Sequence, residues 1–316
     1  MYVHFDFSHS PDTRSYLRMA TGQFDSIRIT HRYRVVVPAA AAAVGVPVAK
    51  MYARVWPQRP AGQWPLRFAF YLVNCVLLAA AAACWFNASL CVGSSPIAAA
   101  LALLAVLSSR WAAYAAGLPL TDSLYLFVVA LGYYAVRRGQ GAGWALAITL
   151  VVGPLAKESF FLVLPWLCWF GRPALSWPRQ AVAIAVGMFA LALVHYAVDT
   201  HIQAPAAETL SNAVEHFNNV TYSIRRALSP KGLGELLSIF GFFVALPPLA
   251  IWLERKLPNT TQWHRSMGWP EVTFVLPVIG QMALSGDLGR MGYLASPVFC
   301  AALSLVITHR RNWLRF

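Results

Sequence analysis

Long apolar runs, separated by short polar segments, recur along almost the whole chain and limit its fold more than any other feature. Only 12% of the residues are Asp, Glu, Lys or Arg, whereas soluble domains carry about 25%. Runs of this length suit α-helices that cross a bilayer, and they lack the alternation of polar and apolar residues that marks the strands of a membrane barrel. The sequence therefore predicts an all-α fold, a polytopic transmembrane helical bundle.

Charged, proline and glycine residues at the ends of the apolar runs indicate about nine membrane spans. The run 35–49 contains Pro38 and Pro47, and we interpret it as a short membrane-edge helix rather than a span. The chain then divides into an extracytoplasmic loop, residues 1–67, and a transmembrane helical bundle, residues 68–316. The predicted spans are 68–87, 95–110, 119–136, 142–156, 158–171, 180–197, 234–253, 271–285 and 291–308.

The basic tail HRRNWLRF at the C-terminus suggests the orientation of the chain. Lys and Arg in short loops favour the cytoplasmic side, so we expect a multi-pass protein of a bacterial inner (plasma) membrane with a cytoplasmic C-terminus. Counting back through nine spans places the N-terminal segment outside, and we expect that a first span is missing before it. The net charge of +13 is spread over loops, which favours membrane lipid as a partner and argues against nucleic acid.

Several ionisable side chains share the predicted outer face. Lys157 and Glu158 interrupt an otherwise apolar stretch, and Gly153-Pro154 just before them predicts two short helices joined by a turn at this face. Ionisable residues at a membrane boundary are functional candidates by default, and the alternative is that they are solvated loop ends. The other candidates on this face of the bundle are Asp122, Asp287 and Arg290.

The polar N-terminal segment adds further candidates. Asp12 precedes a predicted helix over 13–21, where its carboxylate would face the bundle and could accept a proton from a hydroxyl group. Tyr16 belongs to the apolar side of that helix. Arg32 and Arg34 stand just before the membrane edge, where a guanidinium can bind a lipid phosphate in bidentate fashion. The alternative for both arginines is that they extend to lipid headgroups.

A polar cluster, His195, Asp199 and His201, lies at the end of one predicted span. Its spacing would permit a metal site, and the alternative is an interfacial polar cluster. The sequence contains no HxxxH or HExxH pattern and no nucleotide-binding glycine loop.

The order of these motifs is similar to that of a known family. The segments are PDTRSYLRMATG, HRYRVVVP, TDSLYLFVVALGYYAVRR, GPLAKESFFLVLP and GDLGRMGYLASPVF. Together they resemble the multi-spanning bacterial glycosyltransferases of the GT-C class and their uncharacterised membrane relatives. The resemblance implies transfer of a sugar from a polyprenyl-phosphate donor to a glycan, lipid or protein acceptor on the outer face.

In that family the usual catalytic base is an Asp of the first outer loop, which corresponds here to Asp12, with Asp6 as the second choice. The resemblance implies that Arg32, Arg34, Lys157 and Arg290 bind the donor phosphate. Tyr16, Asp122, Glu158 and Asp287 would support them. No cofactor is required; a divalent metal would be compatible with this chemistry, but no residue pattern supports one. The alternatives are a membrane transporter or flippase, and a non-catalytic relative.

Overall fold

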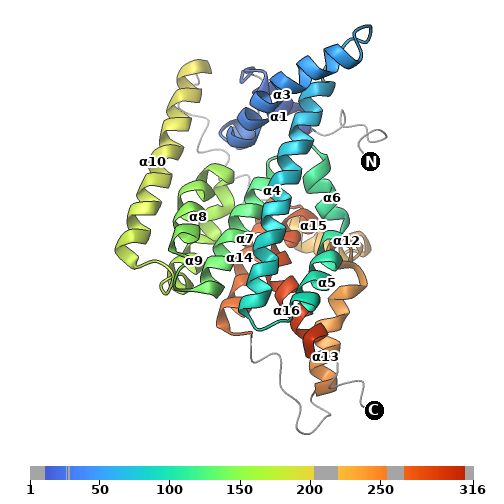
Figure 1. Cartoon of the computed structure of the whole chain (residues 1–316). Coiled ribbons are helices and arrows are strands. Elements are labelled where there is room, and N and C mark those ends of the chain that lie inside the picture. Colours follow the sequence, from blue (N-terminus) through green and yellow to red (C-terminus); the bar gives the residue numbers. More distant parts are fainter. Residues whose placement is uncertain (1–10, 26, 28, 203–219, 255–266, 310–316) are drawn as a thin grey trace.

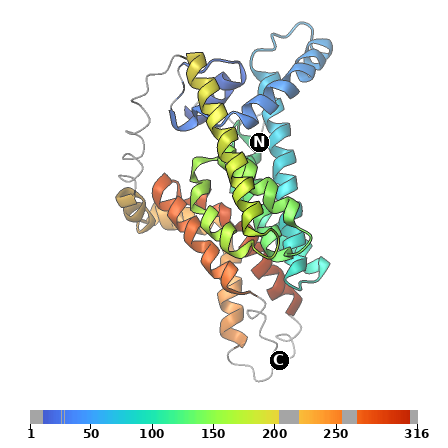
Figure 2. The same cartoon turned by 90° about the vertical axis from the view of Figure 1, so that its left-hand side faces the viewer.

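The computed structural model describes residues 11–25, 27, 29–202, 220–254 and 267–309. Within these ranges every regular element is a helix, which confirms the all-α prediction. Figures 1 and 2 show an elongated bundle, with α1 (Pro11–Ala20) at one end and the end of α16 (Ser296–His309) toward the other.

Helices α1 and α2 (Ile29–Arg32) and the start of α3 (Val36–Val55) lie over one end of the bundle, and we call them the cap. Helix α1 is favoured by the proline at its start and by Asp12 in its first turn, because a negative side chain there complements the helix dipole. The short α2 leads into α3, which packs against α4 (Trp64–Cys91). In Figure 1 the far ends of α3 and α4 project beyond the cap as a helical hairpin.

The remaining helices build the body of the bundle. They are α5 (Pro96–Leu107), α6 (Arg110–Gly117), α7 (Asp122–Arg138), α8 (Gly143–Ala156), η2 (Glu158–Leu162), α9 (Leu164–Phe170), α10 (Trp177–Ile202), α12 (Pro230–Phe240), η3 (Gly241–Ala245), α13 (Leu246–Glu254), α14 (Trp269–Ser285), α15 (Leu288–Gly292) and η5 (Tyr293–Ala295), followed by α16.

Five of the described helical segments are long and apolar enough to cross a membrane, or six if the bent pair α5–α6 counts as one span. They are Val36–Val55, Trp64–Cys91, Trp177–Ile202, Pro230–Trp252 and Leu288–His309. The chain therefore has the helices of a multi-pass membrane protein. The number nine stays a prediction, because several predicted spans, such as α8, are shorter than the roughly 20 residues that a bilayer requires.

Several predicted spans have other bounds in the structure, and some are divided: 158–171 becomes η2 and α9, and 234–253 becomes α12, η3 and α13. Two further differences concern α3 and the end of α8. The predicted membrane-edge helix 35–49 runs on to Val55 as α3, with Pro47 inside it, and reaches the length of a span. The predicted break at Gly153-Pro154 lies slightly later: α8 continues to Ala156 and ends at Lys157, whose backbone is extended. Proline near the end of a helix removes one hydrogen bond without ending the helix there.

Helix α7 lies at the centre of the core, where it packs against α4 and α8. Most of its residues are buried, including Tyr125 and Tyr133. At its C-terminal end Arg137 forms an ion pair of 3.2 Å with the buried Glu271 of α14, which also accepts a hydrogen bond from Tyr133. At its N-terminal end Asp122 enters a larger group of charges, so buried ion pairs fix both ends of this helix.

Candidate functional site

The segment before α7 is held by one buried amide. Asn74 of α4 is fully buried, and its Nδ2 donates to the carbonyls of Leu118 (2.8 Å) and Leu120 (3.2 Å). Its Oδ1 accepts a hydrogen bond from Ser123. Asn74 thus fixes the turn that presents Asp122, and sequence reasoning missed it. The signal was a polar amide in the interior of the apolar run 68–87.

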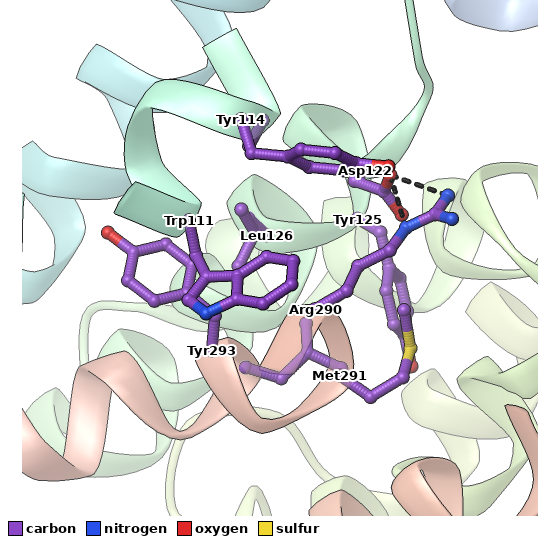
Figure 3. Close-up of a pocket in the computed structure, with 10 residues that line it drawn as sticks. Trp111, Tyr114, Asp122, Tyr125, Leu126, Arg290, Met291 and Tyr293 are labelled. Atoms are coloured by element: carbon purple, nitrogen blue, oxygen red, sulfur yellow. Dashed lines mark hydrogen bonds and ion pairs between the residues drawn. The ribbon is translucent and has the colours of Figure 1, made fainter. Parts of the chain in front are cut away.

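Arg290 and Lys157 converge on Asp122. Arg290 donates to Asp122 Oδ2 from Nε (2.8 Å) and Nη2 (2.7 Å), as the dashed lines in Figure 3 show. Lys157 Nζ lies 3.7 Å from Asp122 Oδ1 and 3.2 Å from the sulfur of Met291. All three charged side chains are at most 12% exposed, so the carboxylate between the two cations offsets part of their desolvation cost.

The backbone of α15 aims Arg290 at this point. Asp287 caps α15 by accepting the backbone N–H of Arg290 at 3.2 Å, and its other oxygen lies 4.0 Å from the guanidinium. Gly289 lies directly against the ring of Trp111. Because a side chain there would meet the ring, glycine lets α15 approach α6 closely.

Asp12 extends the network into the cap. Its Oδ2 accepts a hydrogen bond of 3.1 Å from Arg290 Nη1, and its Oδ1 lies 3.6 Å from His31 Nε2. Burial lowers the pKa of His31 to about 4; the Asp12 carboxylate opposes this shift, whereas Arg34 and Arg290 favour it. His31 is therefore a neutral imidazole near pH 7, beside the carboxylate that the sequence proposed as a base.

Arg34 forms a second branch. It binds Glu158 through Nη2 (2.7 Å) and Nε (3.1 Å), and its Nη1 lies 3.2 Å from the hydroxyl of Tyr16. Tyr16 is fully buried and accepts a hydrogen bond of 3.4 Å from Thr121, directly before Asp122. Glu158 is the more accessible partner, with 45% of its side chain exposed against 11% for Arg34.

The structure thus brings most of the predicted candidates into one group, which we call the charge cluster: Asp12, Tyr16, Arg34, Asp122, Lys157, Glu158, Asp287 and Arg290, with His31 added. Arg32 behaves differently. It is buried, and its Nη2 donates to the Ile27 carbonyl of its own segment. Asp6 lies outside the described residues.

Two cavities adjoin the cluster. The smaller one, about 10 Å³, has room for about one water molecule and lies beside Asp122 and Arg290 among Trp111, Tyr114 and other side chains (Figure 3). The larger one has a volume of about 410 Å³ and shares Trp111 and Tyr114 with the first. Its carboxylates are Asp287 and Glu235, and the rest of its lining is Tyr222, Arg226, Ser285 and Gly286.

The charges of the cluster are mutually compensated. Arg34, Lys157 and Arg290 each contact at least one of the carboxylates Asp12, Asp122, Glu158 and Asp287. An anion that binds to one of these cations must therefore displace the carboxylate that the cation already contacts. Over the described part of the chain, no three His, Cys, Asp or Glu side chains are grouped to hold a metal ion.

The predicted polar cluster at the end of α10 joins that helix to the cap. The Tyr33 hydroxyl donates to Asp199 at 2.8 Å, and the Tyr33 ring stacks on His195 with centroids 3.5 Å apart. His201 meets Phe24 edge-on at 6.0 Å. These contacts correspond to the interfacial alternative.

Comparisons of the chain with protein-family models, with curated proteins and with solved structures found no match.

Proposed function

We propose that this protein is a multi-pass membrane glycosyltransferase that moves a sugar from a polyprenyl-phosphate donor to an acceptor on the outer face of a bacterial inner membrane. One observation carries the proposal. Asp12, Asp122, Lys157 and Arg290 come from distant parts of the chain, yet their side chains form one largely buried network, which reaches a cavity of about 410 Å³ through Asp287. Buried charges are costly in a membrane protein and by default indicate function.

The donor phosphate would bind by replacing the carboxylates that the cations of the cluster contact at rest. Arg34 is one entry point, because its partner Glu158 is about half exposed and can turn to solvent at low cost. Arg290 and Lys157 share Asp122, so a phosphate that approaches them gains two cations at once. Guanidinium groups bind phosphate oxygens in bidentate geometry, and this stabilises the charge that builds up as the phosphate leaves.

Asp12 would act as the general base. At rest its carboxylate accepts a hydrogen bond from Arg290, and movement of Arg290 toward the phosphate would free this carboxylate to accept a proton from the acceptor. Asp12 then takes the proton of the acceptor hydroxyl, whose oxygen attacks the anomeric carbon. The bond from that carbon to the phosphate oxygen breaks, and the phosphate leaves with the electron pair. A single displacement of this kind inverts the anomeric configuration.

Among the described residues Asp287 is a further candidate for the base, because it lines the larger cavity. The aromatic faces of Trp111, Tyr114 and Tyr222 in the same cavity suit the apolar faces of a sugar ring, and its carboxylates can accept hydrogen bonds from hydroxyl groups. Asp287→Asn and Asp12→Asn, assayed side by side for transfer, identify the base by the larger loss of turnover.

A transporter or flippase is the second candidate, and broken helices favour it. Helices α5 and α6 meet at a bend of 70°, and α8 ends beside the cluster at Lys157. Discontinuous helices at charged sites are typical of secondary transporters. The charges of the cluster, however, gather between the cap and one end of α7, which suits an enzyme that meets its donor at the membrane face.

Purified full-length protein distinguishes the two functions. In detergent solution, with a radiolabelled polyprenyl-phosphate sugar and a cell-envelope extract as acceptor, a glycosyltransferase releases the carrier phosphate and labels the acceptor. A transporter gives no product in detergent and only moves the labelled lipid across sealed vesicles. Transport without transfer would reject the enzyme.

A further inference from the structure

The hairpin formed by the far ends of α3 and α4 carries a third cavity, separate from the two beside the charge cluster. This hollow has a volume of about 750 Å³, within the range of pockets that enclose small organic ligands. Its lining is Val48, Met51, Tyr52, Val55, Trp56, Arg59, Pro60, Trp64, Pro65 and Phe68. The hollow begins about 18 Å along the α3 axis from Val36, so it is distinct from the charge cluster.

The two helices present facing apolar stripes to this hollow. On α3 the lining positions 48, 51, 52 and 55 follow the spacing of one helix face, and on α4 residues 64, 65 and 68 do the same. Nearer the cluster the helices pack closely, since a Cβ on Gly45 would lie 3.5 Å from Leu66. Toward the tip the apolar side chains stay open, with Met51 68% exposed and Trp64 46% exposed.

The charge around the hollow is entirely positive. Residues 50–67 contain Lys50, Arg54, Arg59 and Arg67 but no Asp or Glu, and Arg59 itself lines the hollow. Juxtamembrane basic residues attract anionic lipid headgroups. Tyr52, Trp56 and Trp64 are of the residue types that lie at the level of the headgroups.

We propose that the α3–α4 hairpin binds one anionic phospholipid, with an acyl chain in the apolar hollow and the phosphate on Arg59. An apolar channel that ends in a cation matches the two parts of such a molecule, whereas a zwitterionic lipid brings its own cation to Arg59. The proposal is independent of the glycosyltransferase function, because it uses none of the residues of the charge cluster.

Native mass spectrometry of the full-length protein in a neutral detergent tests the proposal by titration with phosphatidylglycerol and, separately, phosphatidylcholine. We expect one tightly bound phosphatidylglycerol and at least fivefold weaker binding of phosphatidylcholine. Arg59→Gln should weaken phosphatidylglycerol binding about fivefold, as expected for loss of one membrane-proximal charge. The matched control is Arg138→Gln, which removes an exposed arginine at the C-terminal end of α7, away from the α3–α4 hairpin, and should leave binding unchanged.

A second variant tests the apolar part of the site. Met51→Trp should fill the hollow and reduce lipid binding, whereas Phe189→Trp, at an exposed apolar position of α10, should not. Both variants should keep the helical circular dichroism of the wild type. Equal binding of the two lipids, equal effects of Arg59→Gln and Arg138→Gln, or displacement of the lipid by inorganic phosphate would overturn the proposal. A dimer that Met51→Glu dissociates would overturn it in favour of a second copy of the chain.

Discussion

Arg290 binds Asp122 through two of its nitrogen atoms, at 2.8 and 2.7 Å, although 168 positions separate the two residues in the chain. This contact joins the start of the central helix α7 to the short helix α15. Asp12 and Lys157 attach to the same pair. The stability of the pair and the function of the cluster can therefore be tested by the same substitutions.

Substitution of either partner should destabilise the fold strongly. Asp122→Asn leaves two buried cations without their shared carboxylate, and Arg290→Gln removes the partner of two aspartates, at a cost of about 3–5 kcal/mol each. The double variant should cost less than the sum of the single variants, because neither Asp122 nor Arg290 then remains as a buried charge facing a neutral substitute for the other. Thermal unfolding in detergent measures all three proteins, with Arg138→Gln as the control. Strict additivity would show that the two residues do not depend on each other.

Asn74 should be as important for the site as the charged residues. Asn74→Ala removes the side-chain donor that the carbonyls of Leu118 and Leu120 share, although the Leu118 carbonyl still accepts from the Leu120 N–H. A buried group that loses its partner costs about 1–3 kcal/mol. Asn87→Ala is a matched control on the same helix, because Asn87 is exposed and donates only to the Ala83 carbonyl of its own turn. Equal melting temperatures of the two variants would exclude a special role for Asn74.

The protein should lose stability in mild acid through His31. The pKa of His31 is lowered to about 4 in the fold, against about 6.5 in an unfolded chain. Between these values the unfolded state binds more protons than the folded state, so stability falls as the pH falls from about 6.5 to about 4. The loss is at most about 3 kcal/mol. Melting temperatures measured from pH 7.5 to 4 should show a smaller decline for His31→Gln than for the wild type; parallel curves would contradict this assignment.

Gly153 should not tolerate a side chain. A Cβ at this position would collide with the buried ring of Phe160, which follows shortly after Lys157 and Glu158 in the chain. Gly153→Ala should therefore destabilise the protein by about 1–3 kcal/mol through overpacking. Gly117→Ala, where a Cβ meets no atom within 4 Å, should be neutral or slightly stabilising, since alanine is the better helix former. The difference in melting temperature between the two variants measures how much the contact with Phe160 destabilises Gly153→Ala.

The sequence predicted where the apolar helices lie, because apolar runs and their polar ends depend on local composition, but it did not predict the breaks inside 158–171 and 234–253. The prediction 142–156 differs from α8 by one residue at its start, and 271–285 differs from α14 by two. The break at Gly153-Pro154 was predicted too early in the chain, because proline and glycine allow a helix to end without determining where it ends. The length of α3 was missed, because Pro47 is tolerated inside the helix.

The site could be predicted only in part. Membrane topology alone suggested that Asp12, Asp122, Lys157 and Arg290 share one face. Which of them touch depends on how α1, α7 and α15 pack, and no local pattern encodes that packing. The role of His31 was missed for the same reason, because its position against Asp12 arises from the turn between α1 and α2.

The most direct test of the proposed chemistry is sugar transfer by the Asp12→Asn variant. Full-length wild type, Asp12→Asn and Asp25→Asn are compared for transfer of labelled sugar from polyprenyl phosphate in membranes, at equal protein levels. Asp25 is exposed, so its substitution is the matched control. Loss of a general base should lower turnover about 10²–10⁴-fold in Asp12→Asn and leave Asp25→Asn at the wild-type rate. Transfer by Asp12→Asn at the wild-type rate would contradict the proposed role of Asp12.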